Sequence, residues 1–288
     1  MKSDTPPLLG AHLSIAKGLH RALYKARAYG CTALQIFTKS ANTWKERALT
    51  RDDIDRFHKA SKETDIKDIV SHTSYLINLA TPEKKKYVLS HNALVNELMR
   101  SSILEIPFIV LHPGAHMGQG VEKGIEKIAA GVDAVFSQTP GIKTRLLFET
   151  TAGQGSGIGH TFEQLASIME KIENQDRCGI CLDTSHIFAA GYDIRAERSY
   201  GKTIDAFDAI IGINNLHVIH LNDSKKAMGS RVDRHEHIGE GHIGMHMFEL
   251  LMNDERFKNI PKIIETPKIK DGRDADEMNL SRLRRLIY

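Results

Sequence analysis

Eight short apolar runs rich in β-branched residues recur along the chain, and segments with helical periodicity separate them. Runs of this length are typical of strands that are buried on both faces of a parallel sheet. Their alternation with helices indicates repeated βα units. The eight predicted strands cover residues 8–15, 33–38, 68–74, 108–114, 145–151, 179–186, 217–223 and 262–267.

Eight βα units in 288 residues fit one closed α/β barrel, since a (β/α)8 TIM barrel typically needs about 250 residues. We therefore predict a single TIM-barrel domain over residues 1–288, with extended loops at the C-terminal ends of its strands. Local signals agree: one predicted helix ends at Gly30, and Thr161 with Gln164 forms a predicted capping box at the start of another.

Ligand-type side chains close or directly follow six of the apolar runs. In a parallel α/β barrel these strand ends converge on one face, which is where the chemistry takes place. A single histidine there is more often a structural residue, but six such residues together favour a metal centre, because buried carboxylates require a nearby cation. Histidine and carboxylate ligands suit zinc. The six residues are His72, His112, Glu149, Asp183, His220 and Glu265.

The longest irregular stretch, residues 222–247, adds two more candidate ligands. Asp233 and His235 are two residues apart, so in an extended segment their side chains point to the same side and can hold one ion. His186, three residues after Asp183, is a candidate third ligand for that ion. The alternative for Asp233 and His235 is a solvated turn.

Two other motifs give weaker signals. Cys178 and Cys181 have a redox or zinc spacing, but residues i and i+3 on a strand face opposite sides, which favours a buried structural role. The glycine-rich segment 153–159 lacks the lysine and hydroxyl residue of a phosphate-binding loop. We interpret it as a flexible loop at the active site that opens the next helix.

Composition bounds the class of protein. The net charge of +3 permits a polyanionic partner without requiring one, and the 15 histidines are consistent with metal binding. No apolar stretch approaches a membrane span, the first residues lack a signal-peptide core, and three cysteines cannot complete a disulfide framework. We expect a cytoplasmic protein with no membrane partner, and a monomer as the simplest state.

Several long segments resemble the signatures of the endonuclease IV family of abasic-site endonucleases, in that family's order. The resemblance extends from Gly10 to about Thr266 and implies a TIM barrel that binds three zinc ions and cuts DNA on the 5′ side of an abasic nucleotide. The segments are SHTSYLINLA, LHPGAH, ETTAGQGSGIG, LDTSHIFAAGYD, HLNDSK and GSRVDRHEHIGEGHIG.

The resemblance also implies how the ligands are divided. Glu149 would bridge the first and second zinc ions, with Asp183 and Glu265 as further carboxylates of the catalytic centre. Manganese or iron at one site is an alternative that mixed ligands allow. The implied sets are His72, His112 and Glu149 for the first ion; Glu149, Asp183, His220 and Glu265 for the second; and His186, Asp233 and His235 for the third.

DNA contacts follow from the same resemblance. Tyr75 and Leu76 would enter the base stack, although ordinary packing at a helix start is the alternative. Asn42 stands where the family often has arginine, which suggests a weaker contact with the DNA stack. Cationic candidates for phosphate contacts are Lys39, Lys225, Arg231 and Arg234, with surface solvation as the alternative for each.

The predicted function is a zinc-dependent abasic-site endonuclease of DNA repair that leaves a 3′-hydroxyl and a 5′-deoxyribose phosphate. Its predicted substrate is double-stranded DNA with abasic sites or blocked 3′ ends. A sugar isomerase or epimerase is one rival, but it gives no reason for the additional D-x-H site. A DNA-lesion binding protein on a decayed barrel is the other, and it would be expected to have lost ligands that this chain retains.

Overall fold

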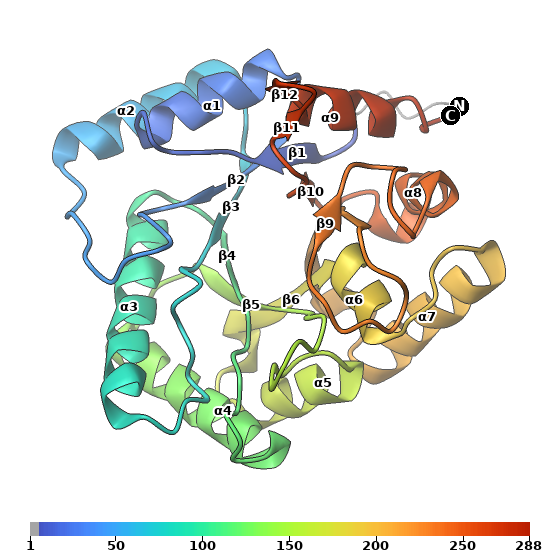
Figure 1. Cartoon of the computed structure of the whole chain (residues 1–288). Coiled ribbons are helices and arrows are strands. Elements are labelled where there is room, and N and C mark those ends of the chain that lie inside the picture. Colours follow the sequence, from blue (N-terminus) through green and yellow to red (C-terminus); the bar gives the residue numbers. More distant parts are fainter. Residues whose placement is uncertain (1–5) are drawn as a thin grey trace.

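The computed structural model describes residues 6–288 and shows a closed barrel of eight strands surrounded by helices (Figure 1). All neighbouring barrel strands are parallel, and β10 closes the barrel by pairing with both β1 and β7. The predicted TIM barrel is confirmed. The barrel strands are β1 (Leu9–His12), β2 (Ala33–Phe37), β3 (Asp68–His72), β4 (Phe108–Leu111), β5 (Arg145–Glu149), β6 (Cys178–Asp183), β7 (Leu216–His220) and β10 (Lys262–Ile264).

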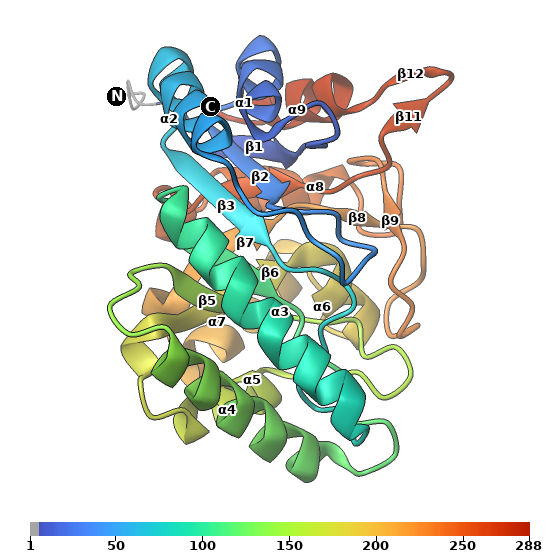
Figure 2. The ribbon, with the colours of Figure 1, turned by 90° about the vertical axis from the view of Figure 1, so that its left-hand side faces the viewer.

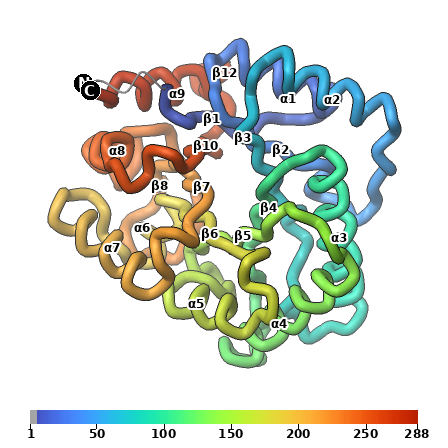
Figure 3. The backbone as a smooth tube through the Cα atoms, turned by 180° about the vertical axis from the view of Figure 1, so that it is seen from behind, coloured from blue at the N-terminus to red at the C-terminus, as the bar shows by residue number. Residues whose placement is uncertain are grey.

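The helices cover the outside of the barrel, as the view from behind also shows (Figure 3). Two short antiparallel hairpins, β8–β9 (Asp223–Ser224 and His235–Glu236) and β11–β12 (Ile269–Lys270 and Arg273–Asp274), lie outside the barrel sheet. The α-helices are α1 (Leu19–Ala28), α2 (Arg51–Thr64), α3 (Lys84–Ile103), α4 (Val121–Gln138), α5 (Phe162–Lys171), α6 (Thr184–Ala190), α7 (Glu197–Ile210), α8 (Met245–Met252) and α9 (Asp276–Arg284). The 3₁₀ turns are η1 (Gln175–Arg177), η2 (Ile213–Asn215) and η3 (Glu255–Phe257).

Alternating side chains of the strands form two cores. The larger core lies between the strands and the helices, and a smaller one fills the barrel interior. Strand β1 adds no apolar side chain to the smaller core, and a Cβ at Gly10 would stand 1.9 Å from the backbone oxygen of Ala33. Seven residues from the other strands fill the interior: Ala33, Val70, Val110, Leu147, Cys181, Val218 and Ile263.

All eight predicted strands are confirmed, but each ends one to three residues earlier than predicted. The strand predicted over 179–186 ends at Asp183, because the Asp183 side chain accepts a hydrogen bond from the His186 amide and thereby caps α6. The capping box at Thr161 forms only in part. Thr161 accepts from the Gln164 amide, but the Gln164 side chain accepts from the amide of Gly159 instead of reaching back to Thr161.

The two cysteines of the C-x-x-C motif are buried free thiols on opposite faces of β6, as predicted. Cys181 belongs to the barrel interior, whereas Cys178 packs in the outer core. The helix predicted to end at Gly30 stops at Ala28, and Gly30 follows with a positive φ of 66°. Among residues 6–288, no helix is both long enough and apolar enough to cross a bilayer.

Candidate metal centre

The six ligand-type residues at the strand ends lie together on one face of the barrel. His72, Glu149, Asp183 and His220 are the last residues of β3, β5, β6 and β7. His112 and Glu265 come directly after β4 and β10. The loops that follow these strands extend beyond this face, with the β8–β9 hairpin among them (Figure 2).

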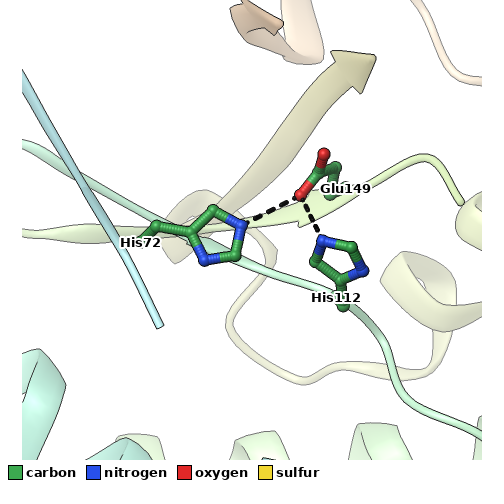
Figure 4. A group of neighbouring side chains, drawn as sticks. All are labelled: His72, His112 and Glu149. Atoms are coloured by element: carbon green, nitrogen blue, oxygen red, sulfur yellow. Dashed lines mark hydrogen bonds and ion pairs between the residues drawn. The ribbon is translucent and has the colours of Figure 1, made fainter. Parts of the chain in front are cut away.

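A first group consists of His72, His112 and Glu149 (Figure 4). The Nε2 atoms of His72 and His112 lie 3.1 and 2.9 Å from Oε2 of Glu149, which is completely buried. Nδ1 of His72 donates to the backbone oxygen of Thr73 at 2.8 Å, which assigns the proton to Nδ1 and leaves the Nε2 lone pair toward Glu149.

A second group shares Glu149 with the first and adds Asp183, His220 and Glu265. Nδ1 of His220 lies 2.9 Å from Oε1 of Glu149 and 3.3 Å from Oε2 of Glu265. Glu149 therefore directs one carboxylate oxygen into each of the two groups. This is the geometry that a ligand bridging two ions requires.

The third group contains Asp183, His186 and His235, and Asp233 lies beside it. Oδ2 of Asp233 lies 3.2 Å from Nε2 of His186, and Oδ1 lies 3.4 Å from Nε2 of His235. Nδ1 of His186 donates to the backbone oxygen of Thr150 at 2.8 Å, so its Nε2 faces Asp233. The structure thus brings together all nine residues that the sequence singled out as ligands.

The loop with Asp233 and His235 is held in place by a buried carboxylate. Asp223 accepts hydrogen bonds at 3.0 Å from the amides of Gly239, Gly241 and Ile243. These bonds fix the C-terminal part of the loop that residues 222–247 were predicted to form. His235 lies in β9, paired with β8, so the loop is more regular than its sequence suggested.

The residues fit divalent cations. Among residues 6–288, Nε2 of His186 and Nε2 of His235 are buried without a hydrogen-bond partner, and both point to the carboxylates of the third group. Burial acts to raise the pKa of Glu149, but His112 and His220 outweigh it and hold that pKa well below its usual range. Burial likewise acts to lower the pKa of His186, and the acids Asp183 and Asp233 raise it well above normal. The buried acids and histidines thus stabilise each other's charged forms. Buried carboxylates that stay ionised in this way can bind cations.

Two further polar residues beside the second group were missed by the sequence reasoning. Gln35 accepts a hydrogen bond from Nε2 of His220 at 2.8 Å and donates to Oε1 of Glu265 at 2.7 Å. Its side chain fixes the orientation of His220, with Nδ1 toward the carboxylates. His12 places Nδ1 2.8 Å from the same Glu265 oxygen. A glutamine within an apolar strand and a histidine at the end of the first strand were the available signals.

A pocket of about 300 Å³ adjoins the first and third groups. It is bounded by the loops after β3, β4 and β5, and by His72, His112, His186 and Asp233. Asn78 joins two of these loops, since its side chain donates to the backbone oxygen of Ala115 at 2.9 Å and accepts from the Ala115 amide at 3.1 Å. The glycine-rich segment 153–159 contributes to the pocket wall, in agreement with its interpretation as an active-site loop.

Most of the predicted DNA contacts lie on the protein surface. Tyr75 is 64% exposed, although its ring packs 5.4 Å from the Phe37 ring, and Leu76 is 36% exposed. The exposed polar candidates are Asn42, Lys225, Arg231 and Arg234.

Lys39 does not belong with these exposed residues. It is 6% exposed, and its ammonium group donates to the backbone oxygen of Thr43 at 2.8 Å and lies 3.7 Å from Glu97. We therefore correct the prediction that Lys39 contacts DNA phosphates, because its charge is turned into the protein. Its burial depends on α3, which begins at Lys84, 45 residues later in the chain.

Comparison with known families first identifies the structural class of the barrel. Residues 23–286 match the family model of xylose isomerase-like TIM barrels. A D-tagatose 3-epimerase-like protein shares this fold, with a TM-score of 0.72 at 17% identity over 96% of both chains. That likeness concerns the fold alone.

The relatives with higher sequence identity are endonucleases. The chain is 45% identical over 279 residues to a probable endonuclease 4 of Geotalea daltonii, covering 97% of this chain and 98% of the relative. It is 44% identical over 281 residues to a probable endonuclease 4 of Chloroflexus aggregans, covering 98% of both. Endonuclease IV from Thermus thermophilus superposes with a TM-score of 0.86 at 34% identity, covering 97% of this chain and 98% of that structure.

The chain belongs to the endonuclease IV family. It is therefore a nuclease of DNA repair, in agreement with the prediction from its motifs. The sugar epimerases share only their fold with this chain.

Proposed function

We propose that the chain hydrolyses the phosphodiester on the 5′ side of an abasic site in double-stranded DNA, leaving a 3′-hydroxyl and a 5′-deoxyribose phosphate. Removal of blocking groups from 3′ ends is part of the proposal, because the same bond type is attacked. The observation that carries it is the placement of Glu149, whose two oxygens face two different groups of histidines and acids. Two ions held this way would lie close enough to act on one phosphate.

Three zinc ions are proposed as the cofactors, and manganese or iron at one site is an alternative. The first ion would be held through Nε2 of His72 and His112, and the second through Nδ1 of His220. Bound ions would acidify water and stabilise the negative charge that develops on the phosphoryl oxygens and on the leaving 3′ oxygen. The proposed ligands are His72, His112, Glu149, Asp183, His186, His220, Asp233, His235 and Glu265.

The roles of the carboxylates follow from their contacts. Glu149 and Glu265 both approach Nδ1 of His220, and Asp183 is fixed by a hydrogen bond of 2.7 Å from the Asn222 side-chain amide. These anchored oxygens would keep the ions at constant positions as the phosphate changes geometry. No side-chain nucleophile is required in this proposal.

Recognition of the lesion is proposed to involve the loops around the pocket. A phosphodiester in a duplex reaches a pocket at the end of a barrel only when the nucleotide is extruded, and a missing base lowers the free energy of extrusion. Tyr75 and Leu76 would fill the stack, Asn42 would lie beside them, and Arg231 and Arg234 would contact phosphates. We further propose that the chain is one catalytic domain over residues 1–288 that works as a cytoplasmic monomer.

The test is cleavage of a labelled duplex carrying one tetrahydrofuran abasic analogue, without added magnesium, together with metal analysis of the same sample. Incision on the 5′ side with about three zinc equivalents is expected. The undamaged duplex and the Glu149→Gln variant are the matched controls, and neither should give product. An intact abasic duplex with the metal sites filled would refute the proposal.

A further inference from the structure

One buried carboxylate on α3 contacts the loops that follow two different strands. Glu97 lies in the second half of α3 and is 1% exposed. Its Oε2 accepts a hydrogen bond of 3.0 Å from the amide of Ser74, in the loop after β3. Its Oε1 lies 3.7 Å from the ammonium group of Lys39, in the loop after β2. In Figure 2 α3 crosses in front of the barrel.

The two loops are also tied to each other at the same place. The Ser74 hydroxyl donates to the backbone oxygen of Ala41 at 2.6 Å, and Lys39 donates to that of Thr43 at 2.8 Å. Glu97 therefore completes a closed set of polar contacts between the two loops and the helix.

The residues held by this set are immediate neighbours of the proposed DNA contacts. Asn42 stands between Ala41 and Thr43, and Tyr75 directly follows Ser74. A shift of either backbone would therefore move Asn42 relative to Tyr75. In contrast, the metal ligands in this region are carried by the strand ends themselves.

A buried ion pair is not an efficient way to stabilise a fold, because apolar side chains of similar volume fill such a space at least as well. Burial raises the pKa of Glu97 to about 7, against the opposing effects of Lys39 and the Ser74 amide. Hydrogen bonds restrict distance and direction more narrowly than apolar contacts do. A polar residue at this position thus indicates that Glu97 sets the distance and direction between the groups it contacts.

We propose that Glu97 is a positioning residue for lesion recognition, which fixes the loop carrying Tyr75 relative to the loop carrying Asn42 through the Ser74 amide and Lys39. The inference rests on the proposed function, since it concerns residues that would meet abasic DNA. It predicts an effect on substrate binding, with the chemical step and the metal centre unchanged.

The test compares two double variants, K39M/E97Q and K39M/E97L. Both remove the buried charges, so neither leaves an unpaired ion in the interior. They differ in the acceptor for the Ser74 amide, which the glutamine side chain would supply and the leucine side chain would not. With a duplex carrying one tetrahydrofuran abasic analogue, KM should be about tenfold higher for K39M/E97L. The two variants should share the same kcat and the same zinc content.

Asp254→Asn is the matched control for a loss of stability alone. Asp254 accepts from the Tyr200 hydroxyl at 2.8 Å and pairs with Arg256, and it lies between α8 and η3, before the start of β10. This variant should lower the melting temperature and leave KM unchanged.

The outcomes separate cleanly. Equal KM values for the two double variants, or an equal rise in KM for Asp254→Asn, would overturn the positioning role. A lower zinc content or kcat confined to K39M/E97L would also overturn it, because the effect would then lie in the metal centre. If the wild-type protein did not incise the abasic duplex, the proposed function would fail and this inference with it.

Discussion

The buried carboxylate of Glu97 gives a quantitative prediction for stability against pH. Its pKa rises from 4.5 to about 7 in the folded protein, chiefly because burial disfavours the charged form. Between these two values the folded state holds a proton that the unfolded chain has released. Stability must therefore fall as pH rises through this window, and K39M/E97Q should lack that fall.

The magnitude follows from the two pKa values. At pH 5 the folded state still holds the proton, which most unfolded chains have released, whereas at pH 8 both states are largely ionised. Linkage then gives a change of about 2.5 kcal/mol between pH 5 and pH 8, with the wild type losing stability relative to K39M/E97Q. The other charged groups that face Glu97 are His72, Glu46 and Arg100, and the variant retains all three.

The assay is urea unfolding of both proteins at several pH values, at one fixed zinc concentration. The difference between the two unfolding free energies isolates the buried pair, because all other titrating groups are common to both proteins. A difference that stays constant within about 0.5 kcal/mol from pH 5 to pH 8 would refute the reasoning. A difference that changes in the opposite direction would refute it as well.

Three further predictions concern the site. Glu149→Gln offers one neutral oxygen where the carboxylate offers two charged ones, so metal analysis should show fewer zinc equivalents and kcat should fall at least about 100-fold, with duplex binding retained; near-normal turnover would contradict the bridging role. Gln35→Ala removes the acceptor that orients His220, and zinc affinity measured against a competing chelator should fall about 10–100-fold; unchanged affinity would show that His220 is oriented by other contacts. Tyr75→Ala should raise KM for the abasic duplex about tenfold at unchanged zinc content, and zinc loss would contradict the division between recognition and metal binding.

The barrel and its ligands could be predicted because both depend on patterns that are local in sequence. A strand needs only its own apolar run, and parallel closure then brings every strand end to one face. His72 and Glu265 could be placed on the same face in this way, although the residues between them fill most of the barrel. The D-x-H spacing of Asp233 and His235 added the third group without knowledge of the loop.

The misses involve residues whose environment is set by a distant element. Lys39 follows a strand and has the sequence signature of an exposed cation, but Glu97 and the Thr43 backbone bury it. Glu97 itself has the signature of an ordinary charged position on a helix surface. Gln35 was absorbed into an apolar strand, since no neighbour in sequence indicates that its partner is His220. Such long-range polar pairs can be identified only from the three-dimensional structure.

The order of the ligands along the chain determines when the metal centre can form during synthesis. Glu265 follows β10, the strand that closes the barrel between β1 and β7. A ribosome-bound chain that stops short of this strand has eight of the nine proposed ligands but neither a closed barrel nor Glu265. The centre can therefore be completed only after β10 and Glu265 have been synthesised. We expect a fragment that ends before β10 to be inactive as a nuclease, because it would lack both the closed barrel and Glu265.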